Sequence, residues 1–217
     1  MGIVWSLFGY GDDMPELESQ QVEAMNGDLS EILPGELYLS SMGCIDHRFL
    51  RDERGITAVL TIKLDPMEPA TTRGLVVKHL RQDDSPLTQI RQHFEEGHAF
   101  IDEHRKNGGV VVHCAAGVSR SATMVISYVM QSERLPLREA FHRVRDARSR
   151  ICPNTGFIKE LIEYEAELGL TTDGSRFFLA EYIVETRLHG ACEQLGITKE
   201  SLTQALEDCN GDINSAT

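Results

Sequence analysis

A cysteine and an arginine six residues apart are the clearest candidates for chemistry in this 217-residue chain. Cys114 follows a short apolar run ending at His113, and Arg120 closes a loop of small residues that contains Gly117. A loop between a strand and a helix can surround an anion with backbone N–H groups. There the pKa of Cys114 should fall below the ~8.5 of a free thiol. The guanidinium of Arg120 can donate two parallel hydrogen bonds to two oxygens of a phosphate group. A thiolate beside a bound phosphate predicts phosphoryl transfer to sulfur and then to water.

Elements that position these residues follow from the apolar periodicity. Strands are expected at 36–40, 56–62, 75–80 and 110–113. Helices are expected at 87–106, 120–133, 137–148 and 154–168. Strands separated by helices predict an α/β fold with a central sheet flanked by helices, and functional loops at the carboxyl ends of the strands. From residue 175 onward the chain should form an extra, separate helical segment.

The formal net charge of −13 argues against a nucleic-acid partner. The charge lies at the two ends of the chain: residues 1–35 have seven acids and no Lys or Arg, and residues 171–217 have eight acids and three bases. The remaining residues, 36–170, carry 19 acids against 18 bases. The central part is therefore nearly neutral.

Five cysteines without a Cys-x-x-Cys pair disfavour a disulfide scaffold and a zinc site, and indicate a reducing compartment. No run reaches the ~18 apolar residues that a membrane span requires. Residues 1–6 lack the basic segment and apolar core of a secretion signal. We therefore expect a cytoplasmic protein without a metal ion or another cofactor.

The run His113-Cys-Ala-Ala-Gly-Val-Ser-Arg-Ser121 resembles the His-Cys-x-x-Gly-x-x-Arg-Ser/Thr signature of cysteine-based protein tyrosine phosphatases. Its variable positions, in Ala-Gly-Val-Ser-Arg-Ser, resemble those of the dual-specificity subfamily. The resemblance extends over 34–170, from Glu36-Leu-Tyr-Leu-Ser to Pro153-Asn-Thr-Gly-Phe. It implies a small atypical phosphatase acting on phosphotyrosine and phosphoserine or phosphothreonine in proteins, through a phosphocysteine intermediate. Two alternatives are an adaptor that binds phosphoproteins or ubiquitin with low activity, and a phosphatase for a non-protein phosphate.

The resemblance also implies a role for each residue of the motif. Ser121 would hydrogen-bond the sulfur and help it leave, and His113 would orient the loop and lower the pKa of the nucleophile. Asn154 would brace the loop, although capping of the following helix is an equally good interpretation. The phosphate would be bound by the loop itself, at Ala115, Ala116, Gly117, Val118, Ser119 and Arg120.

A general acid is needed to protonate the leaving oxygen. The family places this aspartate on a loop before the helix that precedes the signature strand, which is 81–86 here. Asp83 and Asp84 are both candidates. The resemblance favours Asp84, because the family's aspartate lies ten residues before an aromatic residue that corresponds to Phe94.

Six arginines between 134 and 150 form a basic run, which we interpret as a solvated helix face. The alternative is a second anion contact for a doubly phosphorylated substrate. Either Cys44 or Cys152 could form a protective disulfide with Cys114, and the spacing does not decide between them.

Both ends of the chain suggest further partners. Residues 1–33 are interpreted as an acidic arm, with a short helix at 16–26. Gly2 and the serine four residues on fit an N-myristoylation pattern, for which one acyl chain gives only reversible membrane contact; an apolar terminus packed on the domain is the alternative. The helical tail, 171–217, resembles the second half of a ubiquitin-associated domain over 195–216, or forms a plain hairpin packed on the 34–170 catalytic domain.

Overall fold

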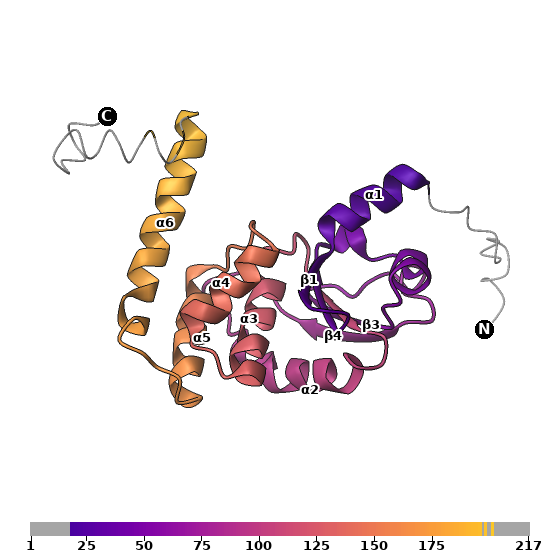
Figure 1. Ribbon diagram of the computed structural model, residues 1–217, viewed down its shortest axis with the longest axis horizontal. Helices are drawn as coiled ribbons and strands as arrows, with labels where there is room; N and C mark the ends of the chain where they lie inside the picture. Colours follow the sequence, from indigo (N-terminus) through magenta and orange to yellow (C-terminus); the bar gives the residue numbers. More distant parts are fainter. Residues whose placement is uncertain (1–17, 197, 199–200, 202–217) are drawn as a thin grey trace, which may run out of the picture.

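The computed structural model describes residues 18–196, 198 and 201 (Figure 1). The predicted acylation at Gly2 lies outside the described residues. So does most of the segment that resembles a ubiquitin-associated domain, since 202–217 are not described. Within the described part, no helix combines the length and apolar character needed to cross a membrane.

A five-stranded sheet in the order β1-β2-β5-β3-β4 forms the centre of the molecule. The strands expected from the sequence are β2 (Leu37–Ser40), β3 (Ala58–Lys63), β4 (Val76–Arg81) and β5 (Val110–His113), and all four pair in parallel. β5 lies between β2 and β3, and all its residues are buried. An apolar run such as Val110–His113 is typical of a strand covered on both faces. The predicted α/β fold is confirmed.

A fifth strand, β1 (Ser30–Leu33), lies inside the segment expected to be an arm. It pairs antiparallel with β2. Between them, Gly35 has a φ of 71° and the amide of Glu36 donates to the carbonyl of Leu33 over 3.0 Å. Pro34 and Gly35 thus make a tight turn of the kind that requires glycine at its third position. The sheet therefore begins before residue 34.

The two faces of the sheet bury alternate residues of each strand. Leu37, Leu39, Val110 and Val112 belong to the larger core, beneath the four central helices. Tyr38, Val59 and Val111 belong to the smaller core on the other face, with Val22 and Met25 of α1 (Ser19–Asp28) and with Phe49 and Leu50 of η2 (Arg48–Glu53). The central helices are α2 (Phe94–His104), α3 (Arg120–Glu133), α4 (Leu137–Ala147) and α5 (Thr155–Glu167).

Helix α2 begins at Phe94, seven residues later than expected. The preceding residues form an irregular loop and one turn of 3-10 helix, η3 (Arg91–His93). Another such turn, η1 (Met42–Cys44), follows β2. The amides of Ile90 and Arg91 donate to the carboxylate of Glu160 on α5, over 3.3 and 2.7 Å, which stabilises this irregular backbone before Phe94.

Helix α6 (Ser175–Leu195) runs along the outer side of α4 and α5 (Figure 1). Phe178 and Tyr182 are buried, and their rings lie 5.5 and 5.7 Å from that of Phe141 on α4. Residues 175–195 are therefore helical as expected, but they are not separate from the domain.

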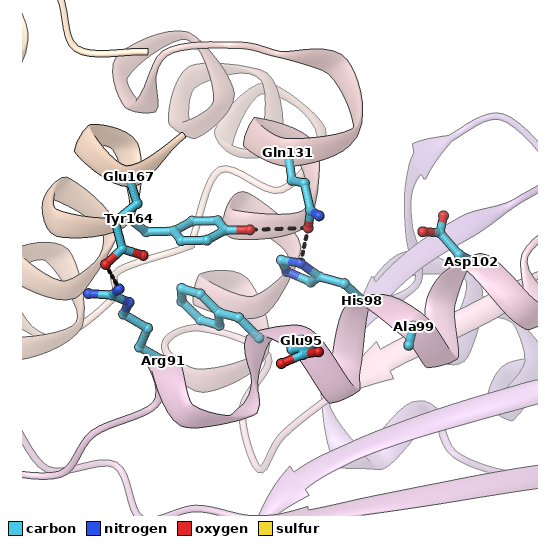
Figure 2. A pocket seen from close by; sticks show the side chains of 9 residues that line it. Arg91, Glu95, His98, Ala99, Asp102, Gln131, Tyr164 and Glu167 are labelled. Carbon is cyan, nitrogen blue, oxygen red and sulfur yellow. Dashed lines mark hydrogen bonds and ion pairs between the residues drawn. The ribbon is translucent and has the colours of Figure 1, made fainter. Parts of the chain in front are cut away.

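A pocket of about 440 Å³ opens between α2, α3 and α5 (Figure 2). The buried ring of His98 contacts the side chains of Gln131 and Ser127, and the hydroxyl of Tyr164 donates to Oε1 of Gln131 over 3.1 Å. Gln131 is eleven residues beyond Arg120, or about 16 Å along a helix. This pocket therefore lies at the far end of α3 from the loop that contains Cys114.

The basic run is already paired within the chain. Arg148 is buried, contrary to the prediction of a solvated face. Carboxylates pair with five of the six arginines, and Arg134 donates to the carbonyl of Leu168 over 2.9 Å. The five ion pairs are Arg138–Glu181, Arg143–Glu133, Arg145–Glu185, Arg148–Asp28 and Arg150–Asp28. A second anion at this run would therefore compete with partners that the chain itself supplies.

Candidate active site

The Cys114 loop lies at the carboxyl edge of the sheet, between the end of β5 and the start of α3. We call residues 114–119 the phosphate loop. Cys114 is 1% exposed, at the base of the loop. No side chain caps the first turn of α3, whose N-cap is Ser119. The first N–H groups of a helix lack partners within the helix, so this end suits an anion.

The sulfur of Cys114 accepts two hydrogen bonds of 3.2 Å, from the amide of Gly117 and from the hydroxyl of Ser121. Burial alone would raise the pKa of the thiol. The hydroxyl and amide of Ser121 and the amides of Gly117 and Val118 outweigh this effect, so the pKa of Cys114 falls below its ordinary value. These contacts favour the thiolate, the nucleophilic form of cysteine.

His113 acts on the backbone of the loop. Its Nδ1 lies 3.1 Å from the carbonyl oxygen of Cys114, and its Nε2 lies 2.8 Å from the hydroxyl of Thr61. A carbonyl only accepts, so Nδ1 carries the proton and Nε2 accepts from Thr61. Burial lowers the pKa of His113 to about 4. The ring is therefore neutral near pH 7 and orients the loop without adding positive charge.

Every carbonyl of the phosphate loop is held by a donor outside the loop. Six consecutive oxygens are engaged in this way, so they point away from the space that the amides surround. The pairs are Cys114 with His113, Ala115 with the amide of Met42, Ala116 and Gly117 with Arg148, Val118 with the amide of Cys152, and Ser119 with the amide of Thr123.

Asp84 lies at the mouth of the phosphate loop. Its Oδ1 accepts from the hydroxyl of Ser119 over 2.6 Å and from Nδ2 of Asn154 over 3.0 Å, and its Oδ2 lies 3.4 Å from Nε of Arg120. The carboxylate of Asp83 instead accepts the amide of Asp84 over 2.8 Å. The structure thus brings Asp84, and not Asp83, to the side chains of the loop.

Asn154 fulfils both interpretations made from the sequence. Its Oδ1 caps α5 by accepting the amide of Phe157 over 3.0 Å, while its Nδ2 reaches Asp84. The main-chain amide of Asn154 donates to the hydroxyl of Ser119 over 3.2 Å. Asn154 thereby links α5, the phosphate loop and the loop that contains Asp84.

Four contributions were missed by the sequence reasoning. Arg148 was grouped with the basic run, and Asp28 with the acidic arm. The carbonyl of Gln82 accepts from Nη1 of Arg120 over 3.2 Å, and the residue type of Gln82 carries no signal for this contact. At Gly156, a Cβ would overlap the carbonyl of Pro86. Only the position of Gly156 at the start of a helix hints at a close backbone approach.

The described cysteines, Cys44, Cys114, Cys152 and Cys192, are free thiols. Cys44 donates to the carbonyl of Met25 over 3.4 Å, and burial raises its pKa to about 12. Cys152 is exposed, and its sulfur accepts from the hydroxyl of Tyr182 over 3.4 Å. In the described part of the chain, no group of three or more His, Cys, Asp or Glu is arranged to hold a metal ion.

Residues 37–167 match the family model described as "Dual specificity phosphatase, catalytic domain". MAP kinase phosphatase with leucine-rich repeats protein 3 of Dictyostelium discoideum is 38% identical over 161 residues, which are 71% of this chain and 18% of that protein. Dual specificity protein phosphatase 1B of Arabidopsis thaliana is 34% identical over 166 residues, 76% of this chain and 96% of that protein. The human tyrosine phosphatase-like serine/threonine/tyrosine-interacting protein has a crystal structure that superposes with a TM-score of 0.59 at 34% identity, over 64% of this chain and 95% of that one. The chain spans 16% to 34% of the length of four curated relatives from Dictyostelium.

Proposed function

Because the chain belongs to the family of dual-specificity phosphatase catalytic domains, we propose that it hydrolyses phosphotyrosine and phosphoserine or phosphothreonine on proteins. The observation that carries this proposal is the sulfur of Cys114. It lies at the base of an amide-lined loop, with hydrogen bonds from Gly117 and Ser121 that favour the thiolate.

In the first step the thiolate of Cys114 attacks phosphorus. The S–P bond forms while the bond from phosphorus to the substrate oxygen breaks, and Asp84 donates its proton to the leaving oxygen. The guanidinium of Arg120 and the loop amides bind the phosphoryl oxygens, which carry the charge of the transition state. The product alcohol or phenol then leaves.

In the second step water attacks the phosphocysteine. Asp84, now a carboxylate, takes the proton from this water as the O–P bond forms. The S–P bond breaks, inorganic phosphate is released and sulfur recovers its electron pair as a thiolate. The hydroxyl of Ser121, 3.2 Å from the sulfur, stabilises that charge.

Dual specificity is supported by the side chains that the loop presents. Ala115 and Ala116 are exposed and small, so no long side chain of the loop narrows the approach to the phosphate. An open approach suits the short side chains of phosphoserine and phosphothreonine as well as phosphotyrosine.

Hydrolysis of an aryl phosphate tests the reaction. We expect Cys114→Ser to lower kcat at least ~10³-fold and Arg120→Lys about 10²-fold, because lysine cannot form the two-pronged contact. Cys192→Ser, which changes a buried cysteine on α6, is the matched control and should keep its activity. Full activity in Cys114→Ser would refute the proposal. Phosphopeptide, phosphoinositide and nucleotide panels then identify the class of substrate.

We also propose that the protein is cytoplasmic and makes reversible membrane contact through an acyl chain on Gly2. The sequence pattern at the N-terminus supports this modification, and a single chain gives only weak binding. Labelling with an alkynyl myristate should mark the protein, and Gly2→Ala should abolish the label. A soluble, unlabelled protein in the labelled cells would contradict the proposal.

Ubiquitin binding by the tail is the remaining proposal, supported by the resemblance of 195–216 to half of a ubiquitin-associated domain. The full chain should be retained on immobilised ubiquitin, and a chain ending at residue 196 should not. Equal retention of the two, or of neither, would contradict a ubiquitin-binding role for this segment.

A further inference from the structure

Arg148 lies behind the phosphate loop, directly after α4, and its side chain is 3% exposed. Its five N–H groups face five acceptors. Nε donates to the carbonyl of Gly117 over 2.8 Å, and Nη2 faces the carbonyl of Ala116 at 3.4 Å and Oδ1 of Asp28 at 2.9 Å. Nη1 faces the carbonyl of Asp28 at 2.6 Å and Oγ of Ser30 at 3.2 Å. A lysine has three N–H groups and could not replace this set.

The two loop carbonyls that Arg148 holds belong to peptide groups whose N–H groups interact with the sulfur of Cys114. A peptide group is planar, so fixing its carbonyl also fixes the direction of the next N–H. The carbonyl of Ala116 shares its plane with the amide of Gly117, which donates to the sulfur of Cys114. The carbonyl of Gly117 shares its plane with the amide of Val118, which also interacts with that sulfur. Arg148 therefore sets two of the amides that face the thiolate.

The absence of a side chain at Gly117 allows the phosphate loop to lie directly against the guanidinium of Arg148. Its φ is 67°, and a Cβ there would overlap both the carbonyl of Ser40 and Nη2 of Arg148. With the backbone seated against the guanidinium, a displacement of Arg148 moves the loop directly.

Asp28 supplies the charge that a buried guanidinium needs. Its side chain is 18% exposed. Oδ1 pairs with Arg148 and Arg150, and Oδ2 accepts the amide of Ser41 over 3.0 Å. Asp28 is the last residue of α1, nine residues before the stretch that matches the family model. One carboxylate thus joins α1, the end of β2 and the residues after α4.

We propose that Arg148 is a positioning residue for the phosphate loop and that Asp28 holds it in place, which makes helix α1 part of the catalytic apparatus. This inference rests on the proposed phosphatase function. Arg148 touches no reacting atom; it acts through the amides of Gly117 and Val118.

The test compares Arg148→Lys and Asp28→Asn with a matched pair, Arg143→Lys and Glu133→Gln. The matched pair makes the same two kinds of change in the ion pair Arg143–Glu133, which joins α4 and α3 away from the loop. Three readouts are recorded: tungstate binding by calorimetry, kcat/KM on an aryl phosphate, and the pH dependence of Cys114 alkylation by iodoacetamide. Tungstate binding and alkylation do not depend on turnover.

We expect Arg148→Lys to weaken tungstate binding and kcat/KM by at least ~10-fold, since misplaced groups cost one to two orders of magnitude. Asp28→Asn should weaken tungstate binding and lower kcat/KM about threefold or more. In both variants the pH dependence of Cys114 alkylation should shift to higher pH. The matched pair should stay within about twofold of the wild type. Folded Arg148→Lys and Asp28→Asn proteins that match the wild type in all three readouts would overturn the inference.

If Arg148→Lys does not fold, Asp28→Asn decides alone, because it keeps the guanidinium and removes only its charged partner. Failure of the proposed function is distinguishable: the wild type itself would then neither bind tungstate nor hydrolyse the ester.

Discussion

The hydroxyl of Ser119 donates to Oδ1 of Asp84 over 2.6 Å, so the phosphate loop holds the aspartate directly. Nδ2 of Asn154 donates to the same oxygen over 3.0 Å. Neither of these two donors hydrogen-bonds Oδ2, which lies on the side of Arg120. In the proposed reaction Oδ2 is therefore the oxygen that carries the proton to the leaving group.

Replacement of the two neighbouring aspartates should have different effects. Asp84→Asn should lower kcat/KM by about 10²-fold on phenyl phosphate, whose leaving group needs a proton, and much less on p-nitrophenyl phosphate. Asp83→Asn should stay within about threefold on both esters, because asparagine can still accept the amide of Asp84. Equal losses on the two esters in Asp84→Asn, or a larger loss in Asp83→Asn, would assign the acid to Asp83.

A methyl group on Gly156 should displace the loop that contains Asp84. A Cβ there overlaps the backbone of Pro86, two residues from Asp84, so the loop must move. We expect Gly156→Ala to lower kcat/KM on phenyl phosphate about tenfold. Gly190→Ala is the control on α6, where a Cβ meets nothing within 4 Å. It should keep its activity and raise the free energy of unfolding by up to ~1 kcal/mol. Unchanged kinetics in Gly156→Ala would contradict this account.

Removal of the Ser121 hydroxyl should raise the pKa of Cys114. That hydroxyl favours the thiolate, so without it the thiolate fraction at a given acidic pH falls. In Ser121→Ala the rate of alkylation at pH 6 should drop by about tenfold or more, as expected for one lost hydrogen bond to a charged group. Rapid-quench experiments should also find more phosphocysteine, since the sulfur leaves less readily. An unchanged alkylation profile would show that the loop amides suffice.

Acid should destabilise the protein through its buried histidines. Burial lowers the pKa of His98, which lies against Gln131 in Figure 2, to about 4. An unfolded chain binds this proton near pH 6.5, so between pH 6.5 and 4 protons favour unfolding. The free energy of unfolding should then fall by up to ~1.4 kcal/mol per pH unit for each such histidine.

Urea unfolding at pH 7, 6 and 5 measures this slope. His98→Gln removes one titrating group and should flatten the slope by up to that amount, although it also costs stability at pH 7. His113 has the same shift and should account for part of the remaining slope. A His98→Gln slope equal to that of the wild type would mean that His98 does not bind its proton on unfolding.

Two adjacent phenylalanines on α6 test whether this helix is part of the folded domain. Phe178 is 4% exposed and packs on Phe141, whereas Phe177 is 62% exposed. Phe178→Ala should lower the free energy of unfolding by about 3–5 kcal/mol, as for a buried aromatic ring. Phe177→Ala should change it by about 0.5 kcal/mol or less. Similar values for the two variants in urea unfolding would argue against a tightly packed α6.

Much of the fold and the centre of the site could be predicted from the sequence, because those signals are local. The apolar run 110–112, the glycine of the loop and the helical periodicity after Arg120 lie in one continuous segment. The strand, the loop and α3 were therefore expected within a residue of their observed bounds. Asp84 was favoured over Asp83 only through the resemblance to the phosphatase family, in which the aspartate lies ten residues before an aromatic residue.

The tertiary structure alone decided which distant side chains support that segment. Arg148 resembles its five basic neighbours until the fold buries it, and Asp28 resembles any acid of the first 35 residues. They meet although 120 residues separate them, and no periodicity along the chain records such a pair. Burial is the physical reason: a guanidinium withdrawn from water requires a partner for each N–H group, and only the packing of α1, β1 and α4 against the loop provides them.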